Sequence, residues 1–358
     1  MKILEPITVK NVTFKNRVTI APSHPYGYGP GPDHTFSDDN IDYYRRRLKN
    51  QNIGLLITQR MQVQSRDAGR GNFALISQDQ KEKLKVLVDA AHENGTKIFA
   101  QIGFPSTGHH RHESVDFWRR EDLKAIEEMH VHSARLAKEA GCDGVEIHGC
   151  NMFFLNLFNS PITNHRIDEY GGNLEGRLKL SENIIKGIKE FADDNFLIDY
   201  RMGWNSDLQT DIETAKKLEE FGIDIFHISY GVRESDRYMP FDFNPVIAYP
   251  GTTREKQIAP ADYPYGDVVY TGAQIKKNLS IPVILVDEIW TYERGEKLLE
   301  NGDGDFIAYS RPFMADPDFS TKSEVNPGYS NCLKCVECAW FSDFHKCPRV
   351  LQRGFDKA

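Results

Sequence analysis

Short runs of apolar, mostly β-branched residues recur along the chain, and amphipathic stretches separate them. In stretches such as residues 78–94 and 120–140, apolar residues lie three and four positions apart, as on one helix face, and a glycine follows. The runs that resemble buried strands cover residues 17–22, 53–58, 97–102, 143–148, 196–202, 224–229, 282–286 and 305–310. Eight strands alternating with helices predict an α/β fold, a closed parallel (β/α)8 TIM barrel.

A doubly wound open sheet is the alternative arrangement for alternating strands and helices. It would usually carry a glycine-rich phosphate-binding turn after its first strand. Residues 27–32, GYGPGP, follow the first strand, but their two prolines and the lack of a helix start predict a loop. We therefore expect residues 1–320 to form one barrel and residues 321–358 to form a short cysteine-containing tail that packs on it. The long connection over residues 231–270 is predicted to be a functional lid.

Composition and charge narrow the possible partners. The 358 residues are 40% hydrophobic and 27% charged, which is typical of a globular protein with a sizeable core. A net charge of -8 gives no field that would gather a nucleic acid, so we expect none as a partner. No run of about 18 apolar residues and no leader segment is apparent, which predicts a cytoplasmic protein without a membrane partner. A small-molecule substrate and a homo-oligomer are expected.

The predicted strands end in an unusual number of polar residues, and active sites of such barrels lie at the carboxyl ends of the strands. Gln101 offers a donor and an acceptor, as a heterocycle with alternating carbonyl and N–H groups would require. Arg201 supplies a permanent cation that would stabilise negative charge on a reduced flavin. Ser310 and Arg311 open the segment after the last strand, where backbone N–H groups favour a phosphate.

Three segments carry a resemblance to a known family: LEPITVKNVTFKNRVTIAPS (4–23), EIHGCNMFFLNLFNSPITNHRIDEYGGNLEGR (146–177) and DFIAYSRPFMADPDF (305–319). Over roughly residues 1–320 the chain resembles the old yellow enzyme family of NAD(P)H-dependent flavin oxidoreductases. The resemblance implies FMN bound noncovalently at the barrel mouth, NADH or NADPH as the hydride donor, and an electron-poor acceptor such as an α,β-unsaturated carbonyl compound.

The resemblance also implies roles for individual residues. His148 and Asn151 match the pair that hydrogen-bonds the acceptor oxygen, where two fixed donors stabilise the developing charge. The residues implied in cofactor binding are Ala21, Pro22, Ser23, Gln101, Arg201, Ser310 and Arg311.

Several positions depart from the family pattern. Phe153 stands where the family usually has a tyrosine that protonates the α-carbon, and a phenyl ring has no proton to give. His24, Tyr26, Tyr28 and the tyrosines of the 231–270 connection are possible substitutes. Quinone or nitro acceptors need no such donor, so a quinone-type, nitro-type or flavin reductase is the alternative function. A catalytically degenerate flavin-binding barrel is a further one.

Other departures concern the cofactor pocket. Arg60 occupies a second-strand position where a small residue is usual, and QIGFPSTGHH (101–110) replaces a loop that usually carries His and Arg. Asp287 and Ser310 stand at glycine positions. An acidic side chain at position 287 would repel a phosphate unless it points away.

Four of the six cysteines lie close together near the end of the chain, spaced C-x2-C-x2-C-x8-C at Cys332, Cys335, Cys338 and Cys347. Thiols clustered in this way usually indicate a metal rather than disulfides in an intracellular protein. An iron–sulfur cluster, a zinc ion and no metal at all are the three interpretations left open.

Overall fold

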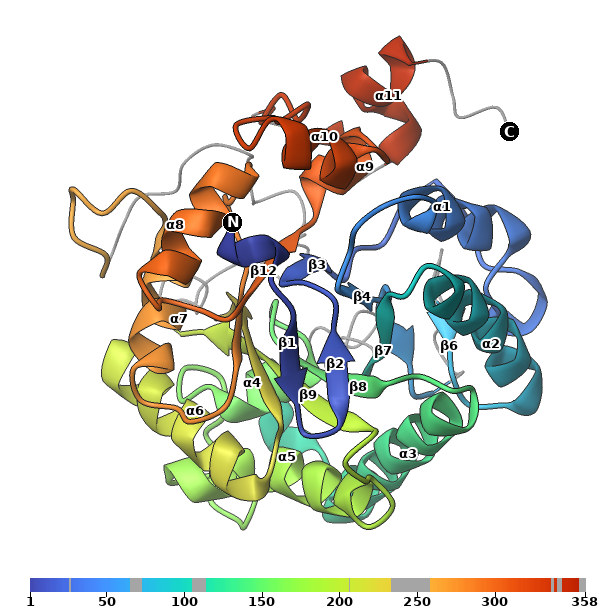
Figure 1. Ribbon diagram of the computed structural model, residues 1–358. Coiled ribbons are helices and arrows are strands. Elements are labelled where there is room, and N and C mark those ends of the chain that lie inside the picture. Colours follow the sequence, from blue (N-terminus) through green and yellow to red (C-terminus); the bar gives the residue numbers. More distant parts are fainter. Residues whose placement is uncertain are drawn as a thin grey trace.

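The computed structural model describes residues 1–25, 27–64, 73–104, 114–205, 207–232, 258–335, 338–339 and 343–353. Eight parallel strands close into a barrel surrounded by helices, which confirms the predicted fold (Figure 1). The order around the barrel is β4-β3-β12-β11-β10-β9-β8-β7, and β4 pairs with β7 to close it. The barrel strands are β3 (Val18–Ile20), β4 (Leu55–Ile57), β7 (Lys97–Gly103), β8 (Gly144–Gly149), β9 (Leu197–Trp204), β10 (Ile225–Tyr230), β11 (Val283–Leu285) and β12 (Phe306–Tyr309).

An antiparallel hairpin precedes the barrel and packs against its core. Its strands are β1 (Ile7–Val9) and β2 (Val12–Phe14). Phe14 is fully buried, and its ring meets Phe99 and Phe306 edge-on, with centroid distances of 6.1 and 5.0 Å. Both partners lie near the amino ends of barrel strands, so the hairpin covers that end of the barrel (Figure 1). Two short strands, β5 (Met61–Gln62) and β6 (Phe73–Ala74), extend the sheet beside β7.

Helices follow most strands and form the outer layer (Figure 1). The α-helices are α1 (Asp38–Leu48), α2 (Gln78–Glu93), α3 (Arg120–Glu139), α4 (Phe154–Asn159), α5 (Leu174–Lys189), α6 (Leu208–Phe221), α7 (Asp267–Lys276), α8 (Tyr292–Glu300), α9 (Arg311–Ala315), α10 (Phe319–Val325) and α11 (Pro348–Gln352). The 3-10 helices are η1 (Lys2–Leu4), η2 (Pro32–His34), η3 (Val115–Phe117) and η6 (Phe344–Lys346). Side-chain oxygens of Ser77, Asn173 and Thr291 cap α2, α5 and α8. Among the described residues, no helix has the length and apolar character needed to cross a membrane.

The end of the described chain packs against the barrel near α1. Phe344 is buried, with ring centroids 4.9 Å from Tyr28 and 5.7 Å from Tyr43. Asp316 accepts a hydrogen bond from Tyr329 and pairs with Arg353 at 3.2 Å. The predicted boundary at residue 320 falls within α10, and the division into barrel and tail stays a prediction.

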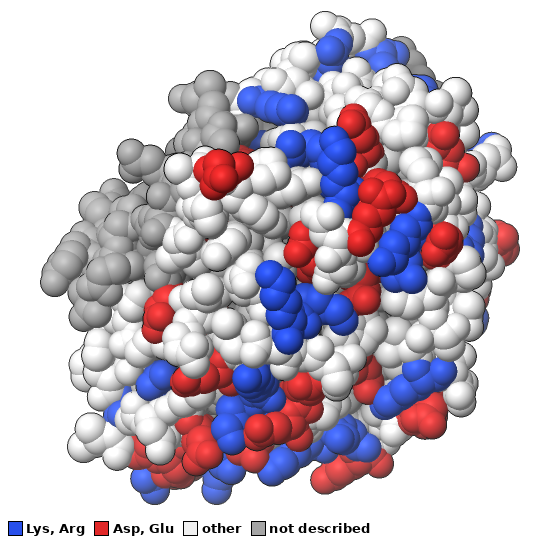
Figure 2. Space-filling model, turned by 60° about the vertical axis from the view of Figure 1, so that its left-hand side comes forward, with Lys and Arg blue, Asp and Glu red and all other residues white. Residues whose placement is uncertain are grey.

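Charged side chains of both signs are interspersed on the face shown in Figure 2. Charged side chains also form ion pairs elsewhere in the described surface, as where Lys217 lies 2.9 Å from Glu220 and 3.5 Å from Glu175. Exposed pairs of this kind contribute little to stability, but their mixture of signs keeps the field over this face weak.

Candidate functional site

The register of the parallel strands brings the predicted site residues into two rows. Gln101 on β7 is paired with Glu146 on β8, and Glu146 is paired with Asp199 on β9. One step further along the strands, His148 on β8 is paired with Arg201 on β9. Because side chains two positions apart share a face of a strand, both rows point the same way, and their buried side chains face the barrel interior.

His148 ends β8 in a buried, cationic environment. Its ring meets Phe153 edge-on with centroids 4.7 Å apart, and Nε2 lies 3.6 Å from the sulfur of Cys150. Nδ1 is buried and has no hydrogen-bond partner among the described residues. Burial, followed by the charges of Arg60 and Arg201, lowers the pKa of His148 well below 6.5. The imidazole is therefore neutral near pH 7 and carries one N–H donor.

Asn151 lies in the turn after β8, where the backbone is left-handed. Its φ is 55° and that of Met152 is 60°, a region that asparagine tolerates better than most residues. The backbone N–H of Asn151 donates to the carbonyl of Tyr230 at 2.6 Å, which fixes the turn against β10. The hydroxyl of Ser229 donates to Asn151 Oδ1 over a long 3.5 Å. This contact orients the amide so that its NH2 group is left to donate to a ligand.

Arg60 covers the phenyl ring that replaces the usual tyrosine. Its guanidinium carbon lies 4.2 Å from the centre of the Phe153 ring, and Nη1 donates to the carbonyl of Phe104 at 3.1 Å. Gly103 allows this approach, because a Cβ there would come within 3.0 Å of the His148 Cβ and 3.2 Å of the Arg60 Cδ. A cation therefore stands beside His148 and Phe153.

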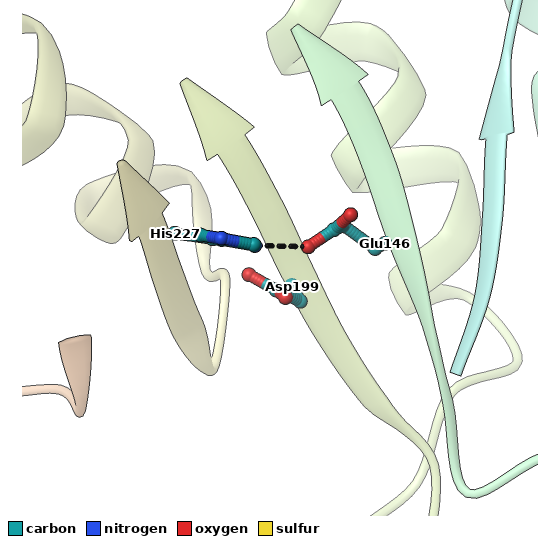
Figure 3. Close-up of side chains that lie close together, drawn as sticks. All are labelled: Glu146, Asp199 and His227. Carbon is teal, nitrogen blue, oxygen red and sulfur yellow. Dashed lines mark hydrogen bonds and ion pairs between the residues drawn. The ribbon is translucent and has the colours of Figure 1, made fainter. Parts of the chain in front are cut away.

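Below this level, Glu146, Asp199 and His227 form a fully buried group that we call the acid cluster (Figure 3). Glu146 accepts two short hydrogen bonds, from Gln101 Nε2 at 2.5 Å and from His227 Nδ1 at 2.6 Å. One ligand atom from each of the three cluster residues lies within 4.8 Å of the others. Neither carboxyl oxygen of Asp199 forms a well-aligned hydrogen bond among the described residues, and the carboxyl group lies close to Glu146.

The pKa values of the two carboxyl groups in the acid cluster shift in opposite directions. Burial opposes ionisation of Glu146, but His227 and Arg201 together hold its pKa below the usual value. Burial and the neighbouring Glu146 raise the pKa of Asp199 well above 3.8, and burial lowers that of His227. The cluster meets the distance requirement of a metal site, but both Glu146 oxygens are already engaged in hydrogen bonds.

Two of the residues predicted to bind the cofactor are brought together at the ends of β3 and β12. The hydroxyl oxygens of Ser23 and Ser310 lie 2.6 Å apart, and Ser23 also donates to the carbonyl of Ala21 at 3.0 Å. Pro22, between Ala21 and Ser23 in the sequence, is half-buried. The Ser310 hydroxyl thus has a hydrogen-bond partner in Ser23, which explains how serine is accommodated at this glycine position of the family pattern.

Arg311 begins α9 and stacks on an aromatic ring. Its guanidinium carbon lies 4.3 Å from the centre of the buried Trp290 ring, and Lys334 Nζ lies 5.3 Å from the same ring. Asp287, at a glycine position of the family pattern, has a φ of 91°, which is strained for a residue with a Cβ. Two cations thus lie near the predicted phosphate position, which favours an anion there.

The tail cysteines lie near this same region. Burial raises the pKa of the Cys332 thiol, Arg311 opposes the rise, and Cys347 and Cys335 add to it. Of the residues that the structure describes, however, only the acid cluster brings three potential ligand atoms within 4.8 Å of one another. The four sulfurs do not gather in this way here, so the metal interpretation of the tail stays a prediction.

The structure describes five of the proposed substitutes for the missing tyrosine. Three are tyrosines of the 231–270 connection that pack on one another: Tyr263 lies 5.6 Å from Tyr265 and 5.2 Å from Tyr270, between ring centroids.

The other two are His24 and Tyr28. Burial, then the charge of Arg60, lowers the pKa of His24 to about 4, so it is unprotonated at neutral pH. Tyr28 packs against Phe344 of the tail. Tyr26 and residues 233–257 of the predicted lid lie outside the described residues.

Sequence reasoning missed the acid cluster, Cys150 beside His148, and the contact between Ser229 and Asn151. The available signal was the alternation of charged with apolar residues inside the predicted strands, as in DGVEIH and FLIDYRM. It indicates inward-facing charges but does not identify their partners.

Comparisons with known proteins find similar sequences and a matching family profile. A family profile described as "NADH:flavin oxidoreductase / NADH oxidase family" matches residues 2–116 and 108–327. The chain is 30% identical to an NADH oxidase of Thermoanaerobacter brockii and 28% identical to a bilirubin reductase of Mediterraneibacter gnavus, over 92% and 94% of its length. These alignments cover 52% and 54% of the relatives, so the chain spans about half the length of each. It is also 28% identical to an NADPH dehydrogenase of Bacillus subtilis, covering 89% of this chain and 93% of that one.

Solved structures have the same fold. A 2-naphthoyl-CoA reductase complex superposes with a TM-score of 0.74 at 22% identity, covering 96% of this chain and 56% of the other. An old yellow enzyme homologue from Zymomonas mobilis gives 0.71 at 20% identity, covering 97% and 99%.

Proposed function

This chain belongs to the NADH:flavin oxidoreductase / NADH oxidase family, the old yellow enzyme family of oxidoreductases, and from that premise we propose its specific activity. The chain is an FMN-dependent NAD(P)H oxidoreductase that passes hydride to an electron-poor acceptor, such as an α,β-unsaturated carbonyl compound. His148 and Asn151 hold the acceptor oxygen. The implied cofactor contacts are made by Ala21, Pro22, Ser23, Gln101, Arg201, Ser310 and Arg311.

The residues at the mouth suit FMN. Arg201 has a buried Nε with no hydrogen-bond partner among the described residues, so a polar ligand would satisfy it. Gln101 commits an N–H to Glu146, which leaves its amide oxygen to accept from the N–H of a flavin edge. Arg311 and Lys334 supply positive charge for a phosphate. The chemistry that bound FMN supplies is hydride transfer from the nicotinamide to the acceptor.

The observation that carries the proposal is the pairing of a neutral His148 with an Asn151 whose NH2 is free of Ser229. Hydride addition to the β-carbon of an enone moves charge onto its carbonyl oxygen. Two uncharged N–H donors stabilise that oxygen, and Arg60 and Arg201 add favourable positive potential nearby.

The visible spectrum of the purified protein, followed by anaerobic addition of NADH or NADPH, tests the proposal. Flavin absorption bands that bleach with a nicotinamide and return when cyclohexenone is added are the expected result. Protein that neither contains nor binds FMN would contradict the proposal, and bound flavin that no nicotinamide bleaches would favour a degenerate barrel.

A quinone or nitro acceptor is the second candidate, and Phe153 is the observation that favours it. The phenyl ring contacts both His148 and Arg60, so a group without a proton to donate stands at the position of the usual proton donor. Quinones and nitro groups take their protons on exposed oxygen atoms, where water can supply them. Anaerobic turnover of menadione but not of cyclohexenone would select this candidate.

Metal analysis of the same protein decides the role of the tail. Iron with acid-labile sulfide, zinc in a one-to-one ratio, or neither metal would each select one of the three interpretations of Cys332, Cys335, Cys338 and Cys347. The assay is independent of the flavin bands, because it measures the elements directly.

A further inference from the structure

The acid cluster is a charged assembly in the dry centre of the barrel. Glu146, Asp199 and His227 are each 0% exposed, and they come from three adjacent strands (Figure 3). Outside the cluster, the charged or titratable groups that face it are Arg201 on β9 and His148 and Cys150 at the end of β8. Arg201 is the permanent cation among them.

Two carboxyl groups in one desolvated space cannot both be ionised when a single fixed cation compensates them. The hydrogen bonds identify which one is charged. Glu146 accepts from Gln101 at 2.5 Å and from His227 at 2.6 Å, whereas neither oxygen of Asp199 forms a well-aligned hydrogen bond to a described donor, and its carboxyl group lies against Glu146. A proton on Asp199 would turn it into a donor toward Glu146, its neighbour in the β8–β9 register.

A metal ion explains this arrangement less well. It would have to displace the hydrogen bonds that Glu146 receives from Gln101 and His227, and all three cluster side chains are fully buried. A proton needs no additional space.

We propose that Glu146, Asp199 and His227 form a proton-holding positioning site, in which Asp199 keeps one proton and Glu146 turns the Gln101 NH2 inward so that its amide oxygen faces the barrel mouth. In this arrangement Glu146 is the single negative charge that balances Arg201. The consequence for a flavin rests on the proposed function, but the protonation of Asp199 does not.

Infrared spectroscopy tests the protonation without any cofactor. Protein labelled with ¹³C-aspartate should show the isotope-shifted C=O stretch of a carboxylic acid at pH 8, and D199N should lose it. The matched control is D211N, because Asp211 is also fully buried, but its pKa is raised only to about 7, so its acid band belongs to lower pH. A band at pH 8 that D199N retains, or no band in the wild type, overturns the inference.

The variant E146Q keeps the test decisive even if D199N does not fold. Burial raises the pKa of Asp199 most, and repulsion from Glu146 adds to it. Removing the Glu146 charge removes that second contribution, so the acid band of Asp199 should disappear at lower pH than in the wild type. An unchanged titration of the band overturns the coupling between the two carboxyls.

Binding of FMN supplies the second readout. In E146Q/D199N the Arg201 charge is uncompensated, so the ratio of the Kd for oxidised FMN to the Kd for reduced FMN should rise about tenfold. A variant at the other end of the barrel, D224N, should leave the ratio unchanged, because Asp224 precedes β10 and pairs with Lys10 at 2.7 Å. An unchanged ratio in the double variant overturns the charge balance between Glu146 and Arg201. If neither the wild type nor the variants bind FMN, the result counts against the proposed function, and the infrared result on Asp199 is unaffected.

Discussion

The guanidinium of Arg60 lies over the ring of Phe153, with its central carbon 4.2 Å from the ring centre. The same ring meets His148 edge-on. Phe153, which has no proton to donate, thus packs against a cation that adds to the effect of burial in lowering the pKa of His148.

Removing that cation should change the titration of His148. Burial is the largest cause of its low pKa, and Arg60 is the next, so R60M should raise the pKa of His148 toward 6.5 without restoring it fully. NMR of ¹³C-labelled histidine, with H148N to assign the signal, measures the shift. Identical His148 titrations in R60M and wild type would contradict this account.

Loss of the Asn151 amide should slow reduction of the acceptor. One donor of an oxyanion-stabilising pair typically contributes about 10²-fold to the rate, so N151A should lower kcat/KM for cyclohexenone or menadione by about that factor. The exposed Asn278, whose side chain contacts only its own helix end among the described residues, provides a control in N278A. Equal rates in N151A and wild type would exclude the assigned role.

Restoring a hydroxyl at position 153 should separate the two acceptor classes. F153Y places a phenol beside His148, and a positioned general acid typically contributes about 10²-fold. Anaerobic steady-state rates should therefore rise with cyclohexenone and stay within about twofold with menadione. If both rates change in parallel, proton delivery does not limit enone reduction.

Asp211 should make stability depend on pH. Burial is the main reason that its pKa is about 7, so the native state binds a proton there that the unfolded state has lost above pH 4. The free energy of unfolding should accordingly fall as pH rises from 5 to 8, by about 2–3 kcal/mol relative to D211N. Urea unfolding of both proteins at the two pH values measures the difference. Parallel pH profiles would refute the assignment.

Phe14 should be important for stability. It is fully buried between Phe99 and Phe306, and truncation of such a phenylalanine typically costs about 3–5 kcal/mol. F14A should lower the free energy of unfolding by that amount, whereas T13A, at an exposed position of the same strand, should change it by less than about 0.5 kcal/mol. Equal losses in the two variants would show that the ring does not anchor the hairpin.

The sequence was sufficient to predict the barrel, because each strand is a short apolar run bounded by helical periodicity, and all eight runs became strands. His148 and Arg201 were predictable as mouth residues, since they stand near strand ends. The acid cluster was not, because the meeting of Glu146 with Asp199 and His227 depends on the stagger between strands, and no local pattern encodes stagger. The stacking of Arg60 on Phe153 likewise joins two loops that are far apart in the chain.

The hairpin of β1 and β2 covers the amino end of the barrel and leaves the carboxyl ends of the strands as the open end. Phe14 is buried at the amino end and the strands close laterally, so for the described residues we expect solvent protons and small molecules to enter through the carboxyl ends. A planar ligand bound across those ends would cover the open end of the barrel. Protons bound inside the barrel would then exchange with bulk water only when the ligand dissociates or the barrel opens transiently. Hydrogen–deuterium exchange of the His227 ring N–H should therefore slow markedly upon ligand binding.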